Sequence, residues 1–82
     1  MLVTIKYFAS VREAIGQASE QRVTSCMTLS ALRDELLASG PAYACLGWNK
    51  AVRMALNQVM CDGSTPLASG CEVAFFPPVT GG

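Results

Sequence analysis

TLSALRDELLAS, residues 28–39, lies near the middle of the chain and has the pattern of its main helix. Three leucines recur at the spacing that places side chains on one helical face: Leu29, Leu32 and Leu36. Thr28 is suited to cap the N-terminus of this helix, and Gly40 with Pro41 is suited to end it. Because an apolar helical face must be buried, we expect the helix to pack across a sheet.

Strand patterns precede this helix. A half-buried strand is predicted for LVTIKYFA, residues 2–9, in which side chains alternate between two faces. One face carries Val3, Ile5 and Tyr7, and the other carries Thr4, Lys6 and Phe8. A helical turn is predicted for SVREAIG, residues 10–16, and a second, more polar strand for SEQRVTS, residues 19–25.

Two more strand patterns follow the helix. A loop with a helical turn is predicted first, for AYACLGWN, residues 42–49. A third strand is predicted for AVRMALNQVM, residues 51–60, because its apolar residues alternate with more polar ones. The last strand is predicted for CEVAFF, residues 71–76, after a turn at CDGSTP, residues 61–66.

The order strand, strand, helix, strand, strand predicts an α+β fold with one main helix across a small mixed sheet. A helix that connects the two halves of the sheet also allows the first and last strands to lie side by side and parallel, as in the β-grasp arrangement. We expect a single domain over residues 1–82, with a flexible C-terminal tail at residues 77–82.

Composition narrows the classes of function. Half of the 82 residues are apolar (51%), which is enough for one core. Six basic and six acidic residues balance without runs, so a nucleic-acid partner is not expected. Apolar stretches are shorter than the roughly 18 residues of a spanning helix, and the N-terminus lacks a secretory leader pattern. We therefore expect a soluble cytoplasmic protein without a membrane partner, and reduced thiols at Cys26, Cys45, Cys61 and Cys71.

The last strand predicts an exposed apolar patch. Cys71, Val73 and Phe75 share one face, and Glu72, Ala74 and Phe76 share the other. Because an unpaired carboxylate is rarely buried, the Glu72 face is expected to be the outer one. Phe8, Ala55 and Met60 are expected to join Phe76 there, with Lys6 and Arg53 at the rim, which is typical of an interface. The alternative is an isolated exposed phenylalanine.

The tail that follows this strand is expected to present its terminal carboxylate to another protein. Pro77 and Pro78 cannot donate hydrogen bonds to a sheet, so strand pairing should end at Phe76. Beyond them, Gly81 and Gly82 lack Cβ atoms, and such an end can enter a narrow channel in another protein. The alternative is an ordinary frayed terminus.

Several segments closely resemble the MoaD branch of the MoaD/ThiS family of sulfur carriers, the small subunits of molybdopterin synthases. They are YFASVREAIG (7–16), LSALRDEL (29–36), NQ (57–58) and above all PLASGCEVAFFPPVTGG (66–82). The resemblance covers nearly the whole chain, and VAFFPPVTGG is its most specific part. It implies a ubiquitin-like β-grasp fold with an extended C-terminal Gly-Gly tail.

The resemblance also implies a sulfur-carrying subunit that is not catalytic alone. In this family a ubiquitin-activating-like adenylyltransferase uses ATP to adenylate the terminal glycine, here Gly82. Sulfur from a donor protein then yields a thiocarboxylate. The large catalytic subunit transfers this sulfur to cyclic pyranopterin monophosphate in molybdenum cofactor biosynthesis. The carrier itself is expected to bind no cofactor or metal, and the family assembly is a heterotetramer.

The resemblance implies functional roles for individual residues that match the family's positions. Gly82 would bear the adenylate and then the sulfur, with Gly81 beside it in the tail. Partner contacts are expected at Phe76, Met60 and Arg12 and along Pro77, Pro78, Val79 and Thr80. Cys71 departs from the family, whose members commonly have an acidic residue there.

Other classes of function remain open at this point. A metal or redox protein is disfavoured because the four cysteines lack the short spacings of cluster and zinc sites, and the chain has no histidine. A protein modifier, whose activated Gly82 is attacked by a lysine, would need the same adenylate. A carrier for thiazole synthesis would share the glycines without the aromatic-proline lead-in. Solvated charges are expected at Glu13, Asp34 and Glu35.

Overall fold

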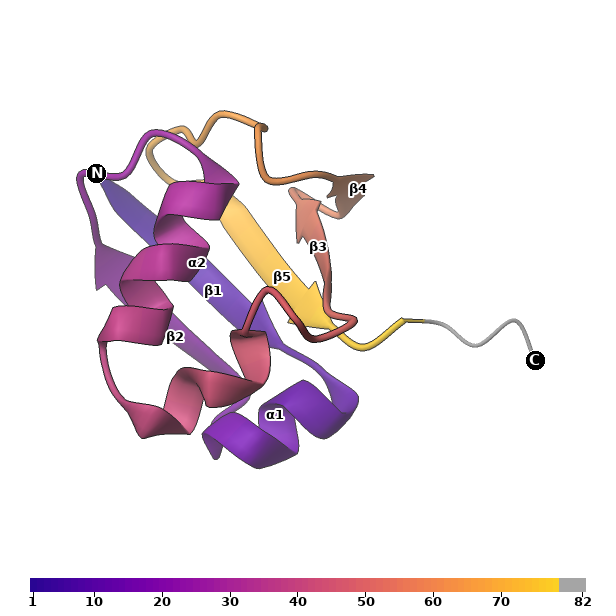
Figure 1. Cartoon of the computed structure of the whole chain (residues 1–82). Helices are drawn as coiled ribbons and strands as arrows, with labels where there is room; N and C mark the ends of the chain where they lie inside the picture. The colour runs from indigo at the N-terminus through magenta and orange to yellow at the C-terminus, as the bar shows by residue number, and fades with distance from the viewer. Residues whose placement is uncertain (79–82) are drawn as a thin grey trace.

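One mixed sheet organises residues 1–78, the part of the chain that the computed structural model describes (Figure 1). The elements in chain order are β1 (Leu2–Tyr7), α1 (Ala9–Ile15), β2 (Ser19–Val23), α2 (Leu29–Ala38), the 3-10 helix η1 (Pro41–Leu46), β3 (Arg53–Leu56), β4 (Val59–Cys61) and β5 (Glu72–Phe76). Within the described residues the sheet order is β2-β1-β5-β3-β4. None of the helices in residues 1–78 combines the length and the apolar character needed to cross a membrane.

The first and last strands lie side by side at the centre of this sheet. β1 and β5 are parallel, from the pair Thr4 and Glu72 to the pair Tyr7 and Phe75. A parallel pair needs a connection that crosses over the sheet, and the chain between the two strands includes α2, which covers one sheet face (Figure 1). The predicted α+β fold with parallel terminal strands is therefore confirmed.

The main helix begins and ends almost where the sequence predicts. The Thr28 Oγ1 atom accepts a hydrogen bond from the Ala31 amide at 3.3 Å, which satisfies one of the free donors of the first turn. The three leucines of the apolar face, Leu29, Leu32 and Leu36, are fully buried. They pack in one core with the inward side chains of the central strands, among them Ile5, Val73 and Phe75.

The predicted third strand over residues 51–60 is wrong, because the chain reverses within it. β3 and β4 form an antiparallel hairpin whose two turn residues, Asn57 and Gln58, have positive φ angles of 49° and 69°. These angles are those of a two-residue hairpin turn whose twist matches the flanking strands. Residues paired across an antiparallel hairpin share a face of the sheet, so the turn places Met60 on the face of Ala55, whereas an unbroken strand would place it on the opposite face.

Candidate functional site

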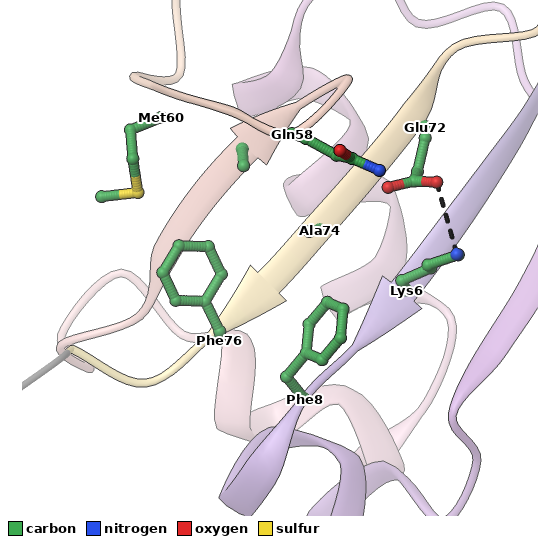
Figure 2. A pocket seen from close by; sticks show the side chains of 8 residues that line it. Lys6, Phe8, Gln58, Met60, Glu72, Ala74 and Phe76 are labelled. Carbon is green, nitrogen blue, oxygen red and sulfur yellow. Dashed lines mark ion pairs between the residues drawn. The ribbon is translucent and has the colours of Figure 1, made fainter.

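A shallow hollow of about 330 Å³ lies on the outer face of the sheet, which α2 does not cover (Figure 2). We call this surface the docking face. Its apolar members are Phe8, Ala55, Met60, Ala74 and Phe76, and its polar members are Lys6, Gln58 and Glu72. The docking face thus gathers residues that are up to about seventy positions apart in the sequence, on four different segments of the chain.

The hollow results from small side chains between large ones. Ala55 and Ala74 are paired across β3 and β5 and are only 6% and 7% exposed, so they form its floor. Phe8 and Met60 stand above this floor at 47% and 58% exposure, and Phe76 lies beside them (Figure 2). Large apolar side chains left this accessible are typical of a surface that a partner covers.

One ion pair lies beside the apolar members of the docking face. Lys6 Nζ is 3.4 Å from the Glu72 Oε1 atom (Figure 2). Exposed pairs of this kind contribute only about 0 to 1 kcal/mol to folding, because water screens both charges. The pair therefore adds little to stability, but it places one positive and one negative group at fixed positions next to the hollow.

The β3–β4 hairpin is fastened to the central strand by its turn. The Asn57 amide donates to the Glu72 carbonyl oxygen at 2.8 Å, and the Asn57 Oδ1 atom accepts from the Glu72 amide at 2.9 Å. Asparagine tolerates the positive φ angle of this position better than most residues. These bonds hold the hairpin against β5 and so position Gln58 and Met60 at the hollow.

The structure brings together most of the surface residues predicted from the sequence. Phe76 and Met60 share the docking face, and Phe8, Ala55 and Lys6 join them as expected. Arg53 is exposed and paired with Phe76 across β3 and β5, which places it on the same face beside the hollow and outside its lining, as expected for a rim residue. The sequence did not indicate Gln58, because its place depends on the unpredicted hairpin turn.

Arg12, predicted as a partner contact, does not line the docking face. Arg12 is an exposed residue of α1. Its backbone carbonyl oxygen accepts a hydrogen bond at 2.8 Å from the amide of Gly16, the residue that caps the helix. Any contact that Arg12 makes with a partner would extend the interface beyond the hollow, onto α1.

A second groove, of about 310 Å³, lies where β5 gives way to the tail. We call it the tail-root groove. It is lined by Pro77 and Pro78 together with residues of α1, η1 and the loop before β3: Ser10, Val11, Cys45, Lys50, Ala51 and Val52. Burial raises the pKa of the Cys45 thiol, which keeps it protonated near neutral pH. The predicted tail residues Val79, Thr80, Gly81 and Gly82 lie outside the described residues.

Two carboxylates predicted as solvated charges also have specific partners, and of the two Asp34 is exposed as predicted while Glu35 is partly buried. The Glu35 carboxylate accepts hydrogen bonds from Arg22 Nε at 2.6 Å and from Thr24 Oγ1 at 2.9 Å. Partial burial acts to raise the pKa of Glu35, but these hydrogen bonds outweigh burial and hold this pKa below its ordinary value. Asp34 accepts a hydrogen bond from the Trp48 indole at 2.6 Å. Both carboxylates thus join α2 to other segments, and they have a structural role.

Comparison with known proteins relates nearly the whole chain to one protein family. A model of the ThiS family matches residues 5–82. The chain is 36% identical to the molybdopterin synthase sulfur carrier subunit of Escherichia coli strain K12, over 99% of this chain and all of that protein.

Solved structures show the same fold. The chain resembles small archaeal modifier protein 1 of Haloferax volcanii, with a TM-score of 0.77 and 25% identity over 95% of this chain and 98% of that one. It also resembles a chain in the complex of subunits 1 and 2 of the molybdopterin-converting factor of Helicobacter pylori, with a TM-score of 0.71 and 25% identity over the whole of both chains. These likenesses confirm the predicted ubiquitin-like β-grasp fold.

Proposed function

The chain belongs to the ThiS family, and from this membership we propose that it is the sulfur carrier subunit of a molybdopterin synthase. One structural observation supports the proposal independently of the names of the related proteins. The docking face ends at Phe76, the last residue of β5, and the Gly-Gly tail begins just after it. A partner that covers the docking face therefore holds the carrier at the point from which its C-terminus leaves the fold.

The proposed reaction takes place on the terminal carboxylate. A carboxylate is a poor electrophile, and its attack on the α-phosphate of ATP gives an acyl-adenylate and pyrophosphate. Sulfur at the oxidation level of sulfide, delivered by a sulfur donor protein, then attacks the Gly82 carbonyl carbon. AMP leaves with the bonding electron pair, and a thiocarboxylate remains. This group would donate its sulfur to cyclic pyranopterin monophosphate in the cytoplasm. The carrier binds no cofactor in this scheme, because ATP is used by the activating enzyme.

The docking face would serve more than one partner. The H. pylori structure is described as a complex of two subunits of a molybdopterin-converting factor, and the present chain resembles one of its chains over its full length. By analogy we propose that a large catalytic subunit covers Phe8, Met60 and Phe76 and receives the tail. The activating enzyme needs the same tail in its own active site, so it would use the same surface at a different stage. Two carriers on a dimer of large subunits would make a heterotetramer.

Residues of the tail would act through their small size. Gly81 and Gly82 offer backbone without side chains, so a channel need only be as wide as an extended peptide. Pro77 and Pro78 restrict the chain just before, which lowers the conformational entropy lost when the tail is threaded. In this scheme the partners catalyse the reactions, since the chain has no histidine and its role is to present one activated group.

A second candidate is a protein modifier, favoured by the resemblance to small archaeal modifier protein 1 of Haloferax volcanii. Both functions begin with the same acyl-adenylate and differ in the nucleophile, which is sulfur for a carrier and a lysine amine of another protein for a modifier. A thiazole-synthesis carrier would make the same thiocarboxylate and give its sulfur to a different acceptor. The nature of the product therefore separates these functions.

Intact-mass analysis of the carrier tests the proposal. After incubation with ATP, the activating enzyme and a sulfur donor, the expected mass increase is the replacement of one oxygen by one sulfur, located at Gly82 by fragmentation. Addition of the large subunit and the pterin precursor should return the carrier to its original mass and form a dithiolene. If the thiocarboxylate forms but loses no sulfur when a molybdopterin synthase large subunit is added, the molybdopterin assignment is contradicted. Lysine adducts of the carrier on other proteins would favour the modifier.

Docking can be tested at Phe76. The substitution Phe76→Asp should weaken binding to the large subunit by about 2 kcal/mol or more, a loss of roughly 30-fold in affinity, because an apolar anchor becomes a charge that must be desolvated. Isothermal titration calorimetry measures this loss. Val23→Asp is the matched control, since Val23 is 78% exposed on the edge strand β2 and lies outside the docking face. Equal affinities for the two variants would show that the docking face is not the interface.

A further inference from the structure

The tail-root groove continues the docking face around the end of β5. Phe76 belongs to the docking face, and the next residue, Pro77, lines the groove. The neighbouring strand makes the same transition, since Val52 lines the groove and Arg53 is paired with Phe76 beside the hollow (Figure 1). Consecutive Cα atoms are about 3.8 Å apart, so the two hollows begin within one residue of each other on both strands.

A partner that covers the docking face would therefore reach the groove as well. Standard protein interfaces bury about 800 Å² of each partner, which corresponds to a patch roughly 30 Å across. Phe76 lies at the boundary between the two hollows, so a patch of this width around it includes the mouth of the groove. We therefore expect one partner to cover both.

The lining of the groove suits an apolar side chain. Its apolar members are Val11, Ala51, Val52, Pro77 and Pro78. Val11 is only 3% exposed and belongs to the buried core, so this part of the lining is held in place by the fold. An apolar side chain that enters such a hollow leaves water and packs against a preformed surface, which is typical of an interface anchor.

Lys50 adds one positive charge to this apolar lining. It is the only charged side chain among the described residues that line the groove. Its side chain is exposed, and none of the ion pairs formed within residues 1–78 includes Lys50 or the nearby Arg53. A partner that covers the groove removes water from the Lys50 amine, and a buried ammonium without a counter-charge is costly. A carboxylate of the partner would offset this cost.

We propose that the tail-root groove is the second half of the carrier's interface, and that it receives an apolar side chain of the large subunit with an adjacent carboxylate that pairs with Lys50. This inference rests on the proposed function, which supplies the large subunit as the partner on the docking face. The carrier would then be held on both sides of the end of β5. Two separate contacts prevent the pivoting that a single patch on one sheet face would allow.

Zero-length cross-linking tests the charge of the occupant. A carbodiimide joins an amine to a carboxylate only where the two are in contact, and the sequence has just two lysines, Lys6 and Lys50. The full chain is mixed with the large subunit of a molybdopterin synthase. The expected product joins Lys50 to an aspartate or glutamate of the large subunit, as mapped by mass spectrometry. Lys50→Arg keeps the charge but has no primary amine, so it should not form this product.

Isothermal titration calorimetry tests the groove by affinity. Lys50→Gln should weaken binding to the large subunit about tenfold at about 0.1 M salt and less at about 1 M, because the Debye length falls from about 10 Å to about 3 Å. Met27→Glu is the matched control, since it lowers the net charge equally at a site outside both hollows. Ala51→Trp should fill the groove and weaken binding about tenfold at either salt concentration. Ala38→Trp, at an exposed position of α2, should not.

Three results would overturn the inference. They are the absence of a cross-link from Lys50 to the large subunit, affinities of Lys50→Gln and Ala51→Trp that equal those of their controls, and a free carrier whose dimer is lost in Ala51→Trp, which would assign the groove to a second copy. Thermal unfolding checks each variant, and Lys50→Gln at an exposed residue decides the matter if Ala51→Trp does not fold.

The variant Phe76→Asp separates this inference from the proposed function. If Phe76→Asp weakens binding while the groove variants bind as their controls do, the docking face is the interface and the groove is not part of it. If the large subunit does not bind the unmodified chain at all, the proposed function is contradicted, and the inference with it.

Discussion

A chain that lacks Gly82 is expected to carry no sulfur while it keeps its fold. The reactive group is the terminal carboxylate, and a chain shortened by one residue would present it short of the position at which the partners act. A chain extended by one residue should fail in the same way, because the Gly82 carbonyl then belongs to an amide. Thiocarboxylate formation is measured by intact mass, and the fold is measured by thermal unfolding.

The fold of these variants should be unchanged because the core is complete before the tail begins. The buried cluster of the described residues ends at Phe75, seven positions before Gly82. Met27→Ala is a suitable control for both measurements, since Met27 is 68% exposed in the loop between β2 and α2. Full sulfur transfer by the shortened or extended chain, without proteolytic trimming, would rule out the terminal carboxylate as the carrying group.

Removal of the Phe75 ring is expected to cost about 3 to 5 kcal/mol of the free energy of unfolding. Phe75 is fully buried, and its ring stacks on that of Tyr7 at a centroid distance of 6.2 Å and an interplanar angle of 17°. Domains of this size have total stabilities of only about 5 to 15 kcal/mol, so Phe75→Ala should be close to unfolding at room temperature. Urea unfolding followed by tryptophan fluorescence measures the loss.

Phe76→Ala is the matched control for this prediction, because the two phenylalanines are neighbours on opposite faces of β5. Phe76 is only half-buried on the docking face, so its truncation should cost much less stability and instead weaken partner binding. Phe75→Ala at a temperature where it is still folded should bind nearly as well as the unmodified chain. Similar losses of stability for the two variants would mean that the faces of β5 have been assigned wrongly.

Local patterns were sufficient where an element depends on its own sequence. The helix over residues 28–39 was predicted from the leucine spacing, the cap residue Thr28 and the Gly40–Pro41 stop, and all three signals lie within the segment itself. The two faces of β5 were likewise predicted, because side chains alternate on any strand whatever its neighbours.

Prediction failed where a remote contact selected the conformation. The turn at Asn57 and Gln58 has no glycine to mark it, and hydrogen bonds between Asn57 and Glu72 help to hold it. Glu35 resembles any charged helical residue until β2 brings Arg22 within 2.6 Å. No local pattern marks Arg33 as buried, yet it is 2% exposed and donates to the Leu46 and Gly47 carbonyl oxygens, and its guanidinium lies over the Trp48 ring.

The sequence by itself determined the α+β class, the inward and outward faces of the terminal strands, and a tail whose glycines leave its carboxylate free of side chains. These properties follow from backbone geometry and side-chain size, which act over a few neighbouring residues. Only the tertiary structure decided that the β3–β4 hairpin places Gln58 at the same hollow as Phe76 and that Lys50 lies beside the root of the tail. Such neighbours come from strand order and hairpin register, which are set by contacts between residues far apart in the chain and so are not encoded in any single segment.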